Sequence, residues 1–236
     1  MHFFRLKREL LLSYINDMKI ASTIVVFLFL ILLSWGDVFA QKKMVEYSTD
    51  FEFKNGIYLS INEFKNNAPI PISKIIFHSN KDDKDFLKYV MDESGFKYID
   101  STGKELELKT NSVWGYCSNG AVFINHGTSF NRVGIIGSIC HFVGLVKVRI
   151  AVSDPFYYNQ SYGSMPPQYT YVSEQLILDF ESGSVLEFNV ENMEYLLQRD
   201  EEILKEFDAL KKKKKRDSIF LYLRKYNEKY PIYFPE

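Results

Sequence analysis

Apolar and polar residues alternate through the middle of the chain in the pattern typical of half-buried β-strands. Leu106 and Leu108 lie between Glu105, Glu107 and Lys109, so one side of this segment is expected to face water. Short turns, several with glycine, separate further apolar segments of this kind. Strands are therefore predicted at residues 74–78, 96–100, 105–109, 113–117, 121–125, 130–137, 140–152, 169–180 and 185–188. Their close spacing predicts an antiparallel β-meander, either open or curled into a partial barrel.

Apolar residues recur at intervals of three and four after Asn189, which predicts two or three amphipathic C-terminal helices. Nearer the front, Ser60 and Glu63 form a capping-box pattern that predicts a short helix over residues 61–66. Residues 86–91 fit either a strand or a helix. The expected fold is an α+β domain spanning residues 41–236, with the C-terminal helices on one face or edge of the sheet. Residues 41–50 are a candidate for disorder.

The N-terminal segment has the features of an export signal. Ten consecutive apolar residues, Ile24–Leu33, follow several basic residues, and Val38-Phe39-Ala40 suits a signal peptidase. We expect residues 1–40 to be a signal peptide cleaved after Ala40, with translation starting at Met1 or at Met18. The alternative is an uncleaved membrane anchor, although the apolar run is short for a span of about 20 residues. The expected location is the periplasm or the cell surface, and only an uncleaved anchor would hold the protein in a membrane.

Two alternatives are open for Cys117 and Cys140. If the protein is exported to an oxidising compartment, the two residues could form a disulfide. The other is two separately buried thiols, because unpaired cysteine is often fully buried. The two residues do not have the spacing of a metal site. A nucleophilic pair of Cys140 with His141 is not expected, since neighbouring residues on a strand point to opposite faces.

One long segment without a strand or helix pattern, residues 153–168, separates the last two long strands. It contains three prolines together with the aromatic residues Phe156, Tyr157, Tyr158 and Tyr162. Long irregular loops are often functional, and aromatic side chains provide rigid contact area for a ligand or partner. We therefore take these four residues as a candidate binding surface. The alternative is a loop that packs its aromatic side chains on the sheet.

Trp114 and Tyr116 are expected to share one face of a strand. Core packing is the expected role of Trp114, and an exposed aromatic contact surface is the alternative.

The amino-acid composition and net charge exclude some classes of protein and of partner. The chain is 46% hydrophobic with twenty Phe and sixteen Tyr, which indicates a folded, strand-rich protein. Its net charge is only −1, so no nucleic-acid partner is expected. The basic run at residues 211–216 could attract anionic lipids or sugars, but six consecutive helical residues point in all directions. A solvated helix is the preferred interpretation, with Asp208 and Lys212 as an i,i+4 pair.

Catalytic and metal-binding motifs are missing from the sequence. The three histidines after the signal segment, His78, His126 and His141, lack the HExxH spacing, and neither GxSxG nor a phosphate-binding loop is found. Asp179 and Glu181 are expected to flank a hairpin turn. We expect neither a metal nor a cofactor.

Four segments resemble a group of uncharacterised exported proteins of the Bacteroidota. They are FKNGIYLSINEFKNNAPI, WGYCSNG, LILDFESGSVLEFN and the closing IFLYLRKYNEKYPIYF, which lie across residues 51–236. The resemblance implies a location in the cell envelope and no particular reaction. We therefore favour a non-catalytic role in binding or envelope assembly, with an envelope protein or a glycan as partner. The alternative is a hydrolase acting on a cell-wall or glycan substrate, with two carboxylates brought together by the fold.

Overall fold

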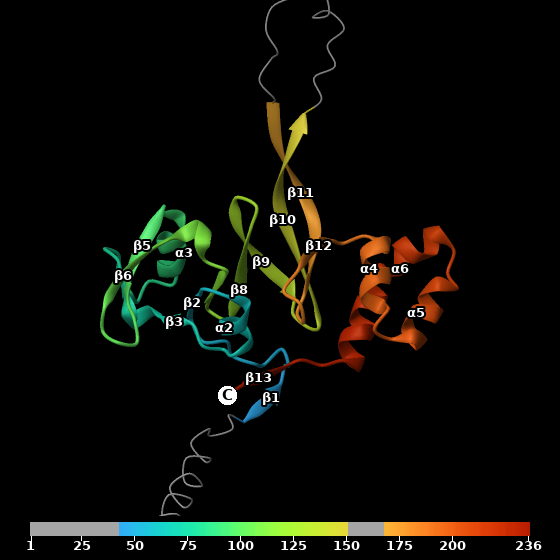
Figure 1. Ribbon diagram of the computed structural model, residues 1–236, viewed down its shortest axis with the longest axis horizontal. Helices are drawn as coiled ribbons and strands as arrows, with labels where there is room; N and C mark the ends of the chain where they lie inside the picture. Colours follow the sequence, from blue (N-terminus) through green and yellow to red (C-terminus); the bar gives the residue numbers. More distant parts are fainter. Residues whose placement is uncertain (1–42, 151–167) are drawn as a thin grey trace, which may run out of the picture. The chain divides into compact units, whose positions relative to one another are not determined.

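The main sheet has eight antiparallel strands, most of them consecutive in the chain (Figure 1). The structure is a computed structural model that describes residues 43–150 and 168–236, and Met44–Glu236 belong to one unit. The strand order is β12-β11-β10-β9-β8-β7-β2-β3. The strands are β2 (Gly56–Tyr58), β3 (Ile70–Pro71), β7 (Gly115–Ser118), β8 (Ala121–His126), β9 (Ser129–Ile135), β10 (Ile139–Ile150), β11 (Gln168–Asp179) and β12 (Val185–Glu187). The predicted antiparallel meander is confirmed, and the sheet is not closed into a barrel.

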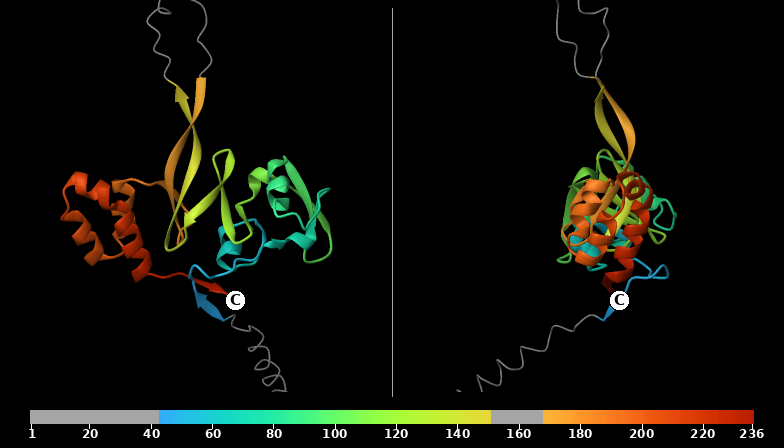
Figure 2. Two further views of the ribbon diagram at one scale, coloured as in Figure 1. Left: turned by 180° about the vertical axis from the view of Figure 1, so that it is seen from behind. Right: turned by 90° about the vertical axis from the view of Figure 1, so that its right-hand side faces the viewer.

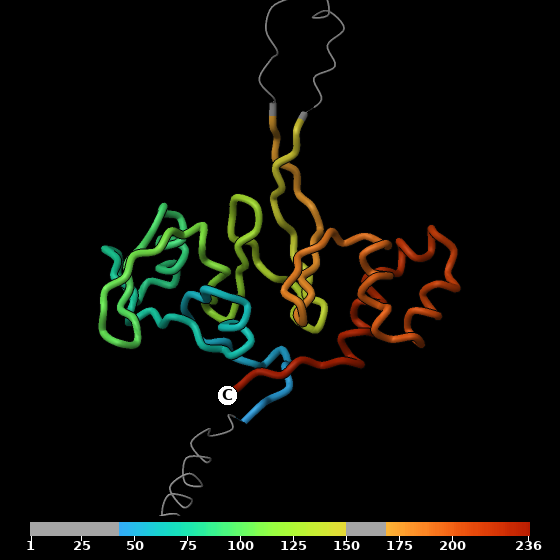
Figure 3. Tube along the Cα trace, viewed as in Figure 1, coloured from blue at the N-terminus to red at the C-terminus, as the bar shows by residue number. Residues whose placement is uncertain are grey.

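Two smaller sheets complete the strands of the described residues. The first has the order β4-β5-β6 and consists of β4 (Ile75–Ile76), β5 (Gly95–Ile99) and β6 (Glu105–Lys109). The second pairs β1 (Met44–Glu46) with β13 (Tyr233–Pro235), so two segments far apart in sequence lie side by side (Figure 3). The expectation of disorder over residues 41–50 is therefore wrong for residues 44–46, because the end of the chain supplies their hydrogen-bonding partner.

The helices are α2 (Ile61–Lys65), α3 (Phe86–Asp92), α4 (Val190–Leu197), α5 (Glu201–Asp208) and α6 (Lys212–Lys229), and short 3₁₀ turns lie at Ile72–Lys74 and Thr110–Ser112. The predicted capping box is present at α2, since the Ser60 hydroxyl accepts a hydrogen bond from the Glu63 backbone N–H at 3.2 Å. The Glu63 carboxylate in turn accepts one from the backbone N–H of Leu59 at 2.5 Å. Residues 86–91, which fit either element, are helical.

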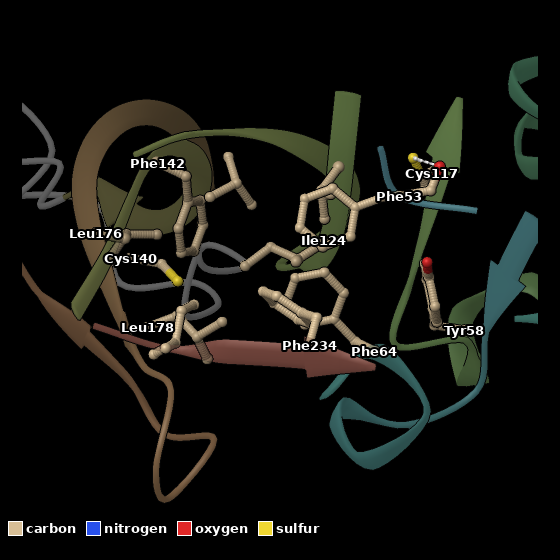
Figure 4. Packing of buried hydrophobic residues seen from close by; sticks show 13 residues of the cluster. Phe53, Tyr58, Phe64, Cys117, Ile124, Cys140, Phe142, Leu176, Leu178 and Phe234 are labelled. Atoms are coloured by element: carbon tan, nitrogen blue, oxygen red, sulfur yellow. Dashed lines mark hydrogen bonds between the residues drawn. The ribbon is translucent and has the colours of Figure 1, made fainter. Parts of the chain in front are cut away.

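Three hydrophobic clusters hold these elements together. The first lies between one face of the main sheet and the segment that ends in β13, and Figure 4 shows Phe53, Phe64 and Phe234 at its centre. The second joins α4, α5 and α6 to Ile139 and Ile177 of the main sheet. The third joins α3 and β5 to β7 and β8. The C-terminal helices therefore cover part of the sheet, as predicted.

The basic run lies at the start of α6 and is largely exposed, in line with the predicted solvated helix. The expected pair of Asp208 with Lys212 is not formed. Asp208 instead contacts Lys215 at 2.7 Å, and Lys215 also contacts Glu194 at 2.5 Å. The reason is that α5 ends at Asp208, so the i,i+4 geometry of a continuous helix does not extend to Lys212. Within the described residues, none of the helices combines the length and the apolar composition that crossing a bilayer requires.

A buried ion pair connects β11 to the C-terminal helices. Asp179 is 2% exposed and accepts hydrogen bonds from both terminal nitrogens of Arg199, at 2.8 and 2.7 Å. Its carboxylate also accepts bonds from the backbone N–H groups of Glu181 and Ser182. Asp179, the last residue of β11, flanks the β11–β12 hairpin turn as predicted, whereas Glu181 lies within the turn and does not flank it.

Candidate functional site

A cavity of about 620 Å³ lies between α3 and the strands β7, β8 and β9. We call it the α3 groove. Its floor is formed by Tyr116, Phe123 and Phe130, and charged residues of α3 and of the segment before it line one side. Polar residues of the 3₁₀ turn at 110–112, of the strands and of the turns between them also line the groove. Its size is within the usual range for small-molecule sites, about 300–1,000 Å³.

The aromatic floor follows directly from strand register. Tyr116 of β7 lies opposite Phe123 of β8, and their rings stack with centroids 4.7 Å apart and planes 7° apart. Phe130, at the start of β9, contacts the Tyr116 ring edge-to-face at 5.3 Å. Cross-strand aromatic pairs of this kind stabilise a sheet and hold the rings in fixed orientations. The floor of the groove is therefore a preformed aromatic surface.

The hydroxyl of Tyr116 is available to a ligand. The residue is only 5% exposed, yet its hydroxyl makes no hydrogen bond to any described residue, and every fully buried polar side-chain atom of these residues has a partner. The hydroxyl must therefore open into the groove. Burial raises the pKa of Tyr116 to about 12, and the nearby carboxylates of Asp92 and Asp85 add to this effect. The phenol stays protonated at neutral pH and can both donate and accept a hydrogen bond.

Hydrogen bonds from side chains to backbone carbonyl groups fix the rim of the groove. The Asn125 side-chain amide donates to the carbonyl oxygens of Asn111 and Val113 at 3.1 and 2.9 Å, which leaves its own oxygen free to accept. The Lys84 carbonyl accepts hydrogen bonds from Ser118 and Asn119 at 3.2 and 3.1 Å. Asn119 has a φ of 51°, a left-handed conformation that asparagine tolerates in the Asn119-Gly120 turn. This turn therefore holds the segment before α3 against the sheet.

The four charged side chains on the α3 side of the groove have no ion-pair partners among the described residues, and their charges sum to zero. The ammonium groups of Lys84 and Lys88 and the carboxylates of Asp85 and Asp92 all line the groove. Among the described residues, none of these four side chains forms an ion pair or a side-chain hydrogen bond. Two positive and two negative charges cancel, so the groove has no net charge to select an ionic ligand.

The aromatic candidates Phe156, Tyr157, Tyr158 and Tyr162 lie outside the described residues. The chain enters and leaves their segment through Ile150 of β10 and Gln168 of β11, which are paired with each other. Their role as a binding surface stays a prediction.

The two cysteines are separate, buried thiols, so the disulfide alternative is not the one the structure shows. Cys117 is on β7 and Cys140 on β10, with β8 and β9 between them. Figure 4 shows the two sulfur atoms on opposite sides of the first cluster. Three strand spacings of about 4.8 Å exceed the separation that a disulfide can bridge. Burial raises the pKa of Cys117 to about 11 and that of Cys140 to about 12, so neither thiol is activated.

The expectation that Trp114 and Tyr116 share one face is wrong. Trp114 stacks on Phe64 of α2 at 5.0 Å and belongs to the first cluster, whereas Tyr116 belongs to the third. The strand begins only at Gly115, so the alternation of faces does not extend back to Trp114. Core packing of Trp114 is nevertheless confirmed.

The histidines do not converge on a site. His141 is 9% exposed, lies 3.3 Å from the Gln175 side-chain oxygen, and packs edge-to-face against Phe188 and Phe220. His126 ends β8, and His78 lies in a bend between β4 and α3. No group of three or more metal-ligating side chains is found within residues 43–150 and 168–236.

Sequence reasoning missed the α3 groove. The only signals were the Asn-Gly turn and the alternation of Phe123 with the buried residues on either side of it. The position of α3 against these strands has no local sequence signature.

Comparisons with protein families, with curated proteins and with solved structures found no match to this chain. The case for a function therefore depends on the geometry of the groove.

Proposed function

We propose that this protein is a non-catalytic binding protein that acts outside the cytoplasm and holds a neutral oligosaccharide in the α3 groove. The observation that carries the proposal is the Tyr116 hydroxyl, which opens into the groove from an otherwise buried residue and has no partner among the described residues. A ligand that displaces water from this hydroxyl must replace the lost hydrogen bond, because a polar group that is buried without a partner is costly. Such a ligand must carry a hydrogen-bonding group that reaches the floor of the groove.

The rest of the groove fits the chemistry of a sugar. A pyranose ring has an apolar C–H face, which packs on aromatic rings such as Phe123 and Phe130, and hydroxyl groups around its edge. The free oxygen of Asn125 and the side chains of Lys88 and Asp92 offer acceptors and donors to those hydroxyls. The balanced charge of the rim favours a neutral sugar over an acidic one.

Hydrolysis is less well supported, although two carboxylates do line the groove. Asp85 immediately precedes α3 and Asp92 is its last residue, so they are separated by seven residues, or about 10 Å along the axis. Glycosidases hold their two carboxyl groups about 5–9.5 Å apart on either side of the scissile bond. Asp85 and Asp92 instead lie on the same wall. This arrangement supports binding over bond cleavage.

The extracytoplasmic location is supported by the apolar Ile24–Leu33 segment and by Val38-Phe39-Ala40 after it. The resemblance to exported proteins of the Bacteroidota points the same way. Envelope glycans are the oligosaccharides that an exported protein of this kind would meet.

The test is calorimetric titration of the purified protein with a panel of neutral envelope and plant oligosaccharides. Tyr116→Phe removes only the hydroxyl, which has no partner within the described protein, so the variant should keep its stability but bind about tenfold more weakly. Tyr195→Phe is the matched control, because Tyr195 is 58% exposed on α4 and does not line the groove. Its affinity should equal that of the unmodified protein.

Two results would overturn the proposal. One is the absence of binding across the panel, and the other is binding that Tyr116→Phe leaves unchanged. Chromatography of the sugars after prolonged incubation separates binding from turnover, and shortened products would favour the hydrolase alternative.

A further inference from the structure

Strands β10 and β11 extend well beyond the strands beside them (Figures 1 and 2). They pair with each other from Ile139↔Asp179 to Ile150↔Gln168. In contrast, β9 pairs with β10 only at His141 and Phe142, and β12 pairs with β11 only over Leu176–Leu178. Residues 143–150 and 168–175 therefore form a two-stranded ribbon, which we call the arm.

The outer edge of β11 has unpaired backbone groups along the arm. The last hydrogen bond on this edge joins the Phe188 N–H to the Gln175 carbonyl at 2.9 Å. Backbone groups of alternate residues point to the same edge, so those of Ser173, Tyr171 and Tyr169 also point outward. Within the described residues nothing pairs with them. This edge is a template for one more strand.

The two edges of the arm differ in charge. Exposed edge strands are commonly protected by charged side chains, especially lysine. The β10 strand of the arm has Lys147 and Arg149, both exposed. The β11 segment Tyr169–Ser173 has no charged residue, is composed mainly of residues that favour strands, and is exposed at Tyr169 (49%), Tyr171 (51%) and Val172 (36%). The arm is therefore protected on one edge and open on the other.

We propose that the open edge of β11 pairs with the same edge of a second copy of this chain. Antiparallel pairing centred on Tyr171 would produce a four-stranded sheet with the two β11 strands in the middle and the two β10 strands outside. Tyr171 would lie opposite its own counterpart, Tyr169 opposite Ser173, and Thr170 opposite Val172.

Self-pairing suits this segment because no like charges meet. Lys147 and Arg149 remain on the outer strands, and the Lys147 ammonium lies 4.5 Å from the centroid of the Tyr169 ring in the same arm. A strand that pairs antiparallel with itself is self-complementary about a two-fold axis, which is the commonest symmetry of protein dimers. The inference does not depend on sugar binding in the α3 groove.

The test is light scattering coupled to size-exclusion chromatography over a range of protein concentrations. We expect a dimer, and Tyr171→Glu should weaken it by about tenfold or more, because two like charges would then face each other across the axis, whereas within one arm the new carboxylate lies opposite Lys147. Val143→Glu is the matched control, since Val143 is 52% exposed on β10 of the same arm and the variant adds the same charge away from the open edge. It should dimerise like the unmodified protein.

A cysteine variant provides an independent measurement. Tyr171→Cys should form a disulfide-linked dimer under mild oxidation, whereas Lys147→Cys should not, and the native thiols will not interfere because both are buried. A monomer at all concentrations would overturn the proposal. So would a dimer that Tyr171→Glu leaves intact, equal weakening by both glutamate variants, or a β11 edge occupied by a different protein.

Discussion

Replacing Asp179 with asparagine should destabilise the protein markedly, because it removes the charge from a buried ion pair. The side chain of Asp179 is enclosed between the β11–β12 turn and Arg199. Burial alone would raise the pKa of this carboxyl group. The hydrogen bonds from Arg199 and Ser182 outweigh burial and lower the pKa from its ordinary value of 3.8 to about 2.

The size of the effect follows from this shift. A pKa lowered by nearly two units corresponds to about 2.5 kcal/mol of stability in the ionised form. Because the folded-state pKa is depressed, this contribution is complete above the unfolded value near 3.8 and is lost as the pH falls through about 2. We therefore expect Asp179→Asn to lower the free energy of unfolding by about 2.5 kcal/mol at pH 7. That corresponds to a melting temperature lower by roughly 5–10 °C for a domain of this size.

Urea unfolding followed by circular dichroism, at pH 7 and at pH 2, is the appropriate assay. Glu181→Gln is the control, because Glu181 lies 3.4 Å from the same arginine but has a 78% exposed side chain. Exposed pairs contribute about 0–1 kcal/mol, so this variant should be nearly neutral. Equal losses for the two variants, or a loss for Asp179→Asn as large at pH 2 as at pH 7, would refute the reasoning.

Three further predictions concern other buried side chains. Burial lowers the pKa of His141, so folding disfavours its protonated form. The stability of the protein should therefore fall as the pH drops below about 6.5, the ordinary pKa of histidine. In urea unfolding experiments, His141→Gln should reduce this loss of stability. An unchanged pH profile would contradict the prediction. Cys117 and Cys140 should react with a thiol reagent only after the protein unfolds, because both thiols are buried. Rapid labelling of the folded protein, or a mass lower by two hydrogens as expected for a disulfide, would contradict this prediction. Phe64→Ala should lower the free energy of unfolding by about 3–5 kcal/mol in thermal unfolding, because Phe64 is 1% exposed and stacks on Phe53 at 5.3 Å. A loss below about 1.5 kcal/mol would contradict its central place in the core.

Sequence patterns predicted the elements whose signals are local. The alternation of Leu106 and Leu108 with charged residues marks β6, and Ser60 marks the start of α2. The amphipathic spacing after Asn189 likewise predicted the C-terminal helices. Each of these signals depends on residues within a few positions of one another.

Features that depend on distant contacts were not predicted. Strands β1 and β13 have three residues each and pair only because both ends of the described domain meet. The aromatic floor of the α3 groove needs the register of Tyr116 against Phe123, and its wall needs α3, whose sequence fits two kinds of element. A hydroxyl without a partner, such as that of Tyr116, is a property of the packed structure alone.

The most direct test of the proposed binding site is nuclear magnetic resonance. Backbone amide shifts are mapped while a neutral oligosaccharide that binds in calorimetry is titrated into the protein. We expect the largest shifts at residues 84–92, 111–119 and 123–130, which surround the α3 groove, and little change in the C-terminal helices. Shifts confined to the arm or to the helices, or no shifts at saturating sugar, would contradict oligosaccharide binding in the α3 groove.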